Sequence, residues 1–306
     1  MTPITISAGN LTVTLMSWGA AITDVRLNGV EHSLTYSTNT LADLQGEWCH
    51  HGTLIGPIAN RISNARIKLD GMMHELERNQ DGRIHLHSGK HATHRQNWTL
   101  TDHTATSASF CLRLPDGMCG LPGNRVITAT YRTTDDATLT LDITGTTDTD
   151  TAMNFANHSY WTLDNGPDWS GHHLRINADR YLPITDDHAP TGDILDVTGT
   201  PMDFRTGQSL TLGETAALDH NFCLSDTDQP LRDVLWFTGA NGVAMTMATT
   251  ACGMQIYDGG GAPDPFKAIA CEAQGWPDAP NHRGFPPIKL RADDTYRQTT
   301  QWRFTR

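Results

Sequence analysis

Two segments of the chain each combine one ionisable side chain with aromatic and amide neighbours. Residues 154–161 read NFANHSYW around His158, and residues 271–281 read CEAQGWPDAPN around Glu272. Histidine exchanges a proton near neutral pH, and glutamate can act as a general base. The two segments therefore predict proton-transfer chemistry on a carbohydrate. We expect folding to bring His158 and Glu272 to opposite flanks of one bound pyranose.

Both residues also have a purely structural interpretation. His158 can be a hydrogen-bonded histidine of a β core, and Glu272 can be a surface glutamate at the end of a strand, as most glutamates are. The apolar neighbours of Glu272 favour the functional interpretation, because a carboxylate among them has a raised proton affinity.

A second group of residues has the chemistry of sugar binding. Arg61, next to Asn60, offers a fork of donors that suits sugar hydroxyls. Asp219 can accept hydrogen bonds from two hydroxyl groups. The alternatives are a salt bridge for Arg61 and an Asx turn for Asp219.

The histidines between residues 85 and 94 raise the question of a metal site. Zinc needs three or four convergent ligands, but residues 88–90 (SGK) interrupt any regular element and no acidic residue lies nearby. We therefore predict no metal at His85, His87, His91 and His94, and expect His87 to line a polar pocket. The pairs His50–His51 and His172–His173 are expected to be solvated loop residues.

Composition narrows the possible partners and the compartment. The 306 residues carry a formal net charge of −12, which argues against nucleic acid, because phosphate backbones require clustered Lys and Arg. The six cysteines form no CxxC pair and are expected to be free thiols. The chain shows neither a signal peptide nor an apolar run of membrane-spanning length. We expect a cytoplasmic protein that does not bind membranes.

The apolar residues alternate with a period of two, which is typical of half-buried strands. The alternation is clear at residues 11–15, 139–143 and 243–247, and residues 126–131 are rich in β-branched and aromatic side chains. Turn signals such as Asp70-Gly71 and Asn241-Gly242 separate these runs. The pattern predicts an all-β protein, an antiparallel sandwich or barrel forming one domain over residues 1–306. Residues 206–218 are expected to hold a short helix.

Taken in order along the chain, these segments resemble the aldose 1-epimerases, or galactose mutarotases. The similarity is carried by ANRI at 59–62, LHSG at 86–89, NHSY at 157–160, TPMDF at 200–204, DHNF at 219–222 and EAQGWPD at 272–278. Leu121 and Ser88 depart from the family's pattern. These departures leave the preferred sugar open.

The resemblance implies a large antiparallel β-sandwich with few short helices and an open sugar cleft. It implies interconversion of the α and β anomers of a free hexose or pentose, without a cofactor. Glu272 would be the general base, His158 the general acid, and His87 would assist at the ring oxygen. The hydroxyl groups would be bound by Asn60, Arg61, Asp219 and Gln255.

Three other functions remain open on the residues alone. A sugar-binding or sensing protein can share the fold without turnover. A hexose-phosphate 1-epimerase would need a cluster of cations, for which Arg66, Lys90 and Arg95 are candidates. A glycosidase needs two catalytic carboxylates, and only Glu272 is well motivated. The oligomeric state is not indicated by the sequence.

Overall fold

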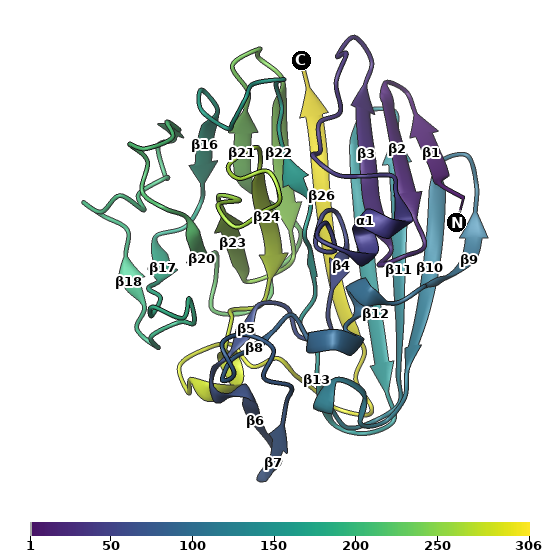
Figure 1. Ribbon diagram of the computed structural model, residues 1–306, viewed down its shortest axis with the longest axis vertical. Helices are drawn as coiled ribbons and strands as arrows, with labels where there is room; N and C mark the ends of the chain where they lie inside the picture. Colours follow the sequence, from purple (N-terminus) through teal and green to yellow (C-terminus); the bar gives the residue numbers. More distant parts are fainter. Residues whose placement is uncertain (1) are drawn as a thin grey trace.

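The computed structural model describes residues 2–306, and antiparallel strands dominate it (Figure 1). The largest sheet has nine strands. In spatial order these are β19 (Gln208–Ser209), β16 (His173–Ile176), β21 (Arg232–Thr238), β22 (Ala244–Thr249), β26 (Tyr296–Thr305), β12 (Thr138–Thr147), β11 (Arg125–Thr134), β10 (Ser107–Leu114) and β9 (Thr99–His103). This sheet forms one layer of a sandwich.

Two smaller sheets form the opposite layer (Figure 1). One has three strands, β1 (Ile4–Ala8), β2 (Leu11–Met16) and β3 (Ala21–Leu27). The other has six, in the order β15 (Tyr160–Trp161), β24 (Ile269–Gln274), β23 (Gly253–Tyr257), β20 (Asp219–Cys223), β17 (Arg180–Leu182) and β18 (Leu195–Asp196). One large apolar cluster with members from all three sheets fills the space between the layers. The predicted sandwich is confirmed.

Short elements complete the fold. The two-stranded ladders pair β4 (Leu54–Ile55) with β14 (Ala156–Asn157), β5 (Arg61–Ile62) with β8 (His85–Leu86), β6 (Arg66–Leu69) with β7 (Met72–Glu75), and β13 (Thr151–Ala152) with β25 (Lys289–Leu290). The helices are α1 (Leu41–Gln45) and the 3₁₀ turns η1 (Ser63–Ala65), η2 (Gly89–His91), η3 (Thr93–Arg95), η4 (Met118–Gly120) and η5 (Ala279–Asn281). Among residues 2–306, no helix has the length and apolar character needed to cross a membrane.

The predicted strands lie where the alternation placed them. Residues 11–15 fall in β2, residues 126–131 in β11 and residues 139–143 in β12, whereas β22 begins one residue inside the predicted run 243–247. Asp70 and Gly71 join β6 to β7 with φ angles of 48° and 85°. A two-residue hairpin turn with both φ angles positive favours this Asp-Gly pair.

The helix predicted over residues 206–218 is wrong. This segment contains only β19 and turns. Gly207 and Gly213 adopt φ angles of 84° and 87°, a left-handed conformation that interrupts a right-handed helix near the start and in the middle of the expected segment.

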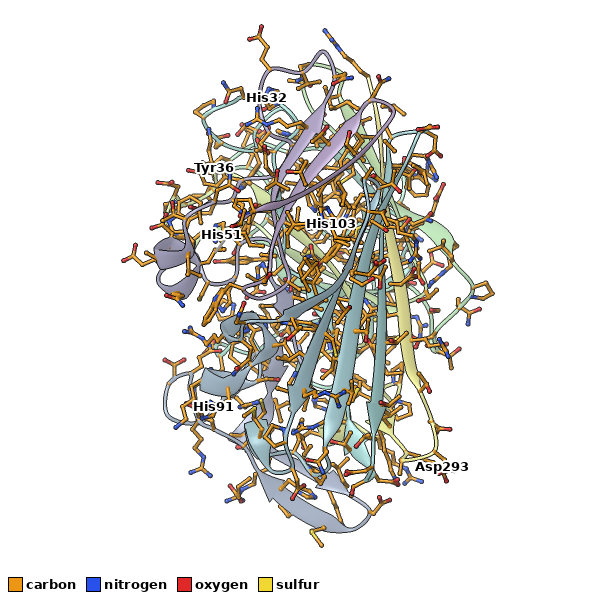
Figure 2. The ribbon with its side chains drawn as sticks, turned by 90° about the vertical axis from the view of Figure 1, so that its right-hand side faces the viewer. His32, Tyr36, His51, His91, His103 and Asp293 are labelled. Atoms are coloured by element: carbon orange, nitrogen blue, oxygen red, sulfur yellow. The ribbon has the colours of Figure 1, made fainter. Side chains whose placement is uncertain are left out.

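In each of the two histidine pairs that were predicted to be solvated, one histidine is buried. His51 is only 2% exposed and stacks on Tyr160 at 4.2 Å between ring centroids. Figure 2 shows His51 near Tyr36 and well separated from His91. His172 is fully buried, whereas His173 is exposed. The expectation failed because aromatic side chains from distant segments cover these two rings.

Large aromatic side chains join the two layers next to the six-stranded sheet. Trp161 on β15 packs against Trp302 and Phe304 of β26, with centroid distances of 5.8 and 5.6 Å. Both tryptophans are fully buried. Trp161 follows His158 by three residues, so this packing also anchors the segment that carries the histidine.

We expect Trp302→Ala to lower the free energy of unfolding by about 3–5 kcal/mol, because it leaves a large cavity between the layers. Urea unfolding followed by circular dichroism measures the loss. Trp236→Ala is the control, since that side chain is partly exposed beneath Arg175 and its removal leaves no closed cavity. Equal losses in the two variants would contradict the proposed packing role.

A second stability prediction concerns His51, whose ring nitrogens have no hydrogen-bond partner among the described residues. Burial lowers the pKa of His51 to about 4. Between pH 6.5 and pH 4 the unfolded chain therefore takes up a proton that the folded chain does not. The free energy of unfolding therefore decreases as the pH is lowered. His51→Phe should reduce the loss between pH 7 and pH 5 by about 2 kcal/mol. Urea unfolding at both pH values tests this, and identical losses in both proteins would refute it.

Candidate active site

A cavity of about 590 Å³ opens beside the six-stranded sheet. Its lining includes six of the seven side chains selected from the sequence: Asn60, Arg61, His87, His158, Asp219 and Glu272. These residues come from positions more than 200 apart in the chain, so the fold assembles the predicted set in one place. The seventh, Gln255, does not line this cavity.

Strand register explains how three of these side chains meet. Gln255 on β23 pairs with Glu272 on β24, and Asp219 on β20 pairs with Tyr257 on β23. Directly paired residues project on the same face of a sheet, and so do residues two apart on one strand. Glu272, Gln255, Tyr257 and Asp219 therefore lie on one face. Cys271 and Ala273, on either side of Glu272, belong to the apolar core.

His158 lies between β14 and β15 and is held by its backbone. Its N–H donates to the carbonyl of Thr53 at 3.0 Å, and its carbonyl accepts from the N–H of Gly52 at 3.0 Å. The imidazole is buried, as is the carboxyl of Glu272, and His158 Nε2 lies 3.5 Å from Glu272 Oε1. The two groups are direct neighbours, so the expectation that they flank a pyranose from opposite sides is corrected.

Burial controls the protonation of this pair. Burial, followed by the charge of Asp219, raises the pKa of Glu272 well above its ordinary value, with Arg61 opposing the shift. Burial, followed by the neighbouring His50 and His51, lowers the pKa of His158 well below its ordinary value. Both shifts favour the uncharged forms, a protonated carboxyl beside a neutral imidazole. His158 Nδ1 and Glu272 Oε2 have no hydrogen-bond partner within residues 2–306.

His87 is held by a strained turn. His87 and Ser88 have φ angles of 51° and 62°, which are uncommon for residues with a side chain. The Ser88 hydroxyl secures the turn through bonds to both the N–H and the carbonyl of Ile58, at 2.7 and 3.0 Å. His87 Nδ1 accepts a hydrogen bond from the backbone N–H of Asn60 at 3.1 Å. In the neutral ring the proton must then be on Nε2, which makes Nε2 a donor.

Asp219 is the centre of a polar network at the cavity wall. Its Oδ2 lies 3.2 Å from Arg61 Nη1 and 3.0 Å from His188 Nδ1, and its Oδ1 accepts from Gln255 Nε2 at 2.7 Å. Arg61 Nε also donates to Gln80 Oε1 at 3.0 Å. Gln255 is 2% exposed, and its hydrogen bond to Asp219 connects it to the cavity wall. The salt bridge that was the alternative for Arg61 is present, and it lies inside the cavity.

Several cavity residues were not selected from the sequence. Tyr160 and Tyr257 each lie two positions beyond a selected residue, His158 and Gln255. The period of two along an extended chain could have identified both. His50 lines the cavity, although it was expected to be a solvated loop residue. Its ring centroid lies 5.5 Å from that of His158.

The four histidines considered for a metal site are not brought together. His85 Nδ1 bonds to the carbonyl of Glu77 at 2.7 Å, and His91 is exposed at the surface. Among the described residues, the groups with convergent metal-ligand atoms do not include His85, His87 or His91.

Comparisons with known proteins identify the family of the chain. A family model described as aldose 1-epimerase matches residues 3–303. Human galactose mutarotase is 31% identical over 315 residues, covering 96% of this chain and 91% of the human protein. The aldose 1-epimerase of Escherichia coli is 30% identical over 320 residues, covering 96% of this chain and 92% of its own.

A solved structure shows the same fold. The crystal structure of a GalM/aldose epimerase homologue from C. elegans superposes with a TM-score of 0.92 at 28% identity, covering 99% of this chain and 98% of the other. The match of sequence and fold over almost the full length leaves one conclusion: the chain belongs to the aldose 1-epimerase family.

Proposed function

We propose that this protein is a mutarotase that interconverts the α and β anomers of a free aldose by opening and closing the sugar ring. The observation that carries the proposal is the buried pair of His158 and Glu272, 3.5 Å apart in the wall of a sugar-sized cavity. The ring oxygen and the anomeric hydroxyl of an aldose are bonded to the same carbon. An acid and a base that serve these two oxygens must therefore be close neighbours.

The reaction follows from moving two protons. Transfer of the shared proton from Glu272 to His158 gives a carboxylate and an imidazolium. Glu272 then removes the proton of the anomeric hydroxyl while His158 protonates the ring oxygen, and the bond between C1 and the ring oxygen breaks. The aldehyde rotates about its C1–C2 bond, and the reverse transfers close the ring on the other face. The open-chain stage leaves a protonated carboxyl and a neutral imidazole, the state that burial favours.

The other cavity residues orient the sugar in this proposal. His87 Nε2 donates a hydrogen bond near the ring oxygen, and its ring centroid lies 5.6 Å from that of His158. Arg61, Asn60 and Asp219 bind hydroxyl groups, with Gln255 holding Asp219 in place. A carboxylate offers about four lone-pair positions, so Asp219 retains capacity for a hydroxyl donor.

We also infer one domain over residues 1–306 and a reducing, cytoplasmic location. The main apolar cluster takes residues from Ile4 to Phe304, so both ends of the chain contribute to one core. All six cysteines are free, as expected in a reducing compartment.

We expect Glu272→Gln and His158→Asn each to lower the rate of anomerisation by at least ~10²-fold, since each removes a proton-transfer group. Polarimetry on freshly dissolved α-glucose and α-galactose measures the rate. Glu47→Gln and His91→Asn make the same chemical changes on exposed side chains and should leave the rate unchanged. Near-normal turnover in either site variant would disprove the assignment. Tight sugar binding by a wild-type protein that does not accelerate anomerisation would point to a sensor instead.

The charges of the cavity predict that phosphorylated sugars are poor substrates. Arg61 is the one Lys or Arg side chain among the described residues that line it, and Asp219 already pairs with it. Asp258 and Glu272 add further carboxyl groups to the lining. We expect kcat/KM for glucose to exceed that for glucose 6-phosphate by at least ~10-fold, because a phosphate would lack a free cation. A preference for glucose 6-phosphate would favour the hexose-phosphate epimerase.

A further inference from the structure

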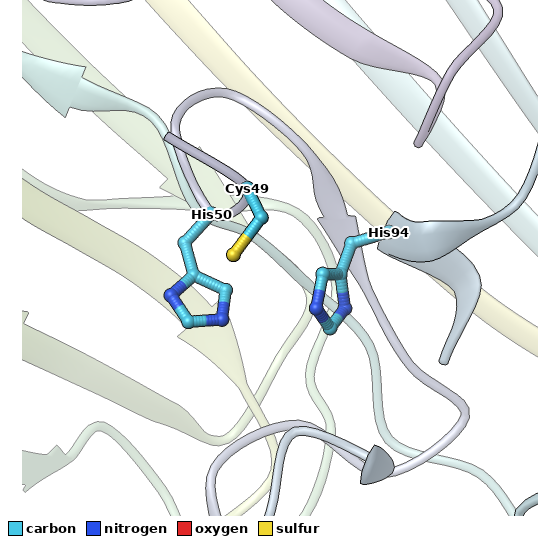
Figure 3. A group of neighbouring side chains, drawn as sticks. All are labelled: Cys49, His50 and His94. Atoms are coloured by element: carbon cyan, nitrogen blue, oxygen red, sulfur yellow. The ribbon is translucent and has the colours of Figure 1, made fainter. Parts of the chain in front are cut away.

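Beside the proposed acid–base pair, a cysteine and two histidines converge next to the cavity, and one of them, His50, also lines it. Cys49 and His50 follow helix α1, and His94 lies in the 3₁₀ turn η3. One ligand atom from each residue can be chosen so that all three lie within 4.8 Å of one another. Figure 3 shows the Cys49 sulfur on the same side as the two imidazole rings. The proposed mechanism uses none of these three side chains.

His94 has unmet hydrogen-bonding capacity. Its side chain is buried, with the residue 1% exposed, and neither ring nitrogen has a hydrogen-bond partner among residues 2–306. A buried polar group without a partner costs free energy, so such a group in a native protein calls for a ligand or a bound solvent molecule. The unpartnered ring nitrogens of His94 therefore indicate a bound ligand, and this evidence is independent of the distances between the three residues.

We propose that Cys49, His50 and His94 form a binding site for a divalent transition metal ion of the zinc type. A thiolate and two imidazoles are a ligand set that zinc uses, and three protein ligands leave one position open. Tetrahedral zinc holds its sulfur and nitrogen ligands about 3.4–3.6 Å apart, as follows from its bond lengths. The three ligand atoms, which lie within 4.8 Å of one another, must approach by about 1 Å to bind the ion.

The surroundings of the three residues suit this ion. Arg95 Nη2 donates a hydrogen bond to Cys49 Sγ at 3.4 Å and so holds the sulfur in place. Binding replaces the thiol proton by the metal, and that proton leaves to solvent. His50 also lines the sugar cavity, so the proposed metal site adjoins it.

Metal binding is tested on the full-length protein after removal of metal with a chelator, in the absence of sugar. Zn²⁺ is titrated in competition with a chromophoric chelator, and Co²⁺ is used as a spectroscopic probe. We expect one equivalent of either ion to bind, and the cobalt form to show a thiolate-to-metal charge-transfer band. Cys49→Ser should abolish that band, and Cys49→Ser and His94→Gln should each weaken zinc binding by at least ~100-fold.

A neighbouring cysteine and histidine provide the matched controls. Cys119 Sγ lies 3.4 Å from the carbonyl of His91, outside the proposed ligand set. Cys119→Ser and His91→Gln should keep wild-type zinc affinity and the cobalt band. The site is disproved if the wild-type protein binds no zinc, if Cys49→Ser binds it as tightly as wild type, or if the control variants lose it. If His94→Gln fails to fold, the cobalt spectrum of the wild-type protein and the zinc affinity of Cys49→Ser still test the proposal. A negative result leaves the proposed mutarotase activity untouched, because no sugar is used.

Discussion

Burial of one carboxyl group beside one imidazole is the constraint on which the rest of the site depends. Water around Glu272 would favour its charged form, and water around His158 would favour the imidazolium. Removing that water pushes both groups toward neutrality, so the proton rests on the carboxyl group and the imidazole is uncharged.

The sandwich holds the side chains of this pair in buried positions. Tyr160 and Trp161 lie two and three positions beyond His158, and Trp161 is fixed between the layers by Trp302. Glu272 is placed by backbone pairing on both sides of β24. The carboxyl group is thus set by the sheet and the imidazole by aromatic packing. Neither depends on a flexible side chain for its position.

Much of the architecture could be predicted because alternation and turn chemistry are local signals. The strands and the Asp70-Gly71 hairpin follow from neighbouring residues alone. The helix expected over residues 206–218 failed for a local reason as well, since two left-handed glycines outweighed the apolar spacing. The prediction that the six selected residues share one cavity came from the family resemblance. Spacing along the chain does not reveal contacts between residues that lie 200 positions apart.

What could not be predicted depends on burial by distant segments. His50 and His51 look like polar loop residues in the sequence, yet contacts with Tyr160 and Trp48 draw the loop inward. Asp219 and Gln255 both look like sugar ligands. Only the hydrogen bond between them shows that Gln255 supports Asp219 from behind.

The alternation along β24 limits how this protein can change. Its odd-numbered neighbours Cys271 and Ala273 fill the core, while Glu272 faces the cavity. An insertion or deletion of one residue inside this strand would exchange the two faces and drive a carboxyl group into hydrocarbon. The loops that contribute Gln80, His188 and Phe266 carry no such restriction. Divergence toward new sugars is therefore expected to accumulate in these rim loops, while the strand that holds Glu272 stays the same length.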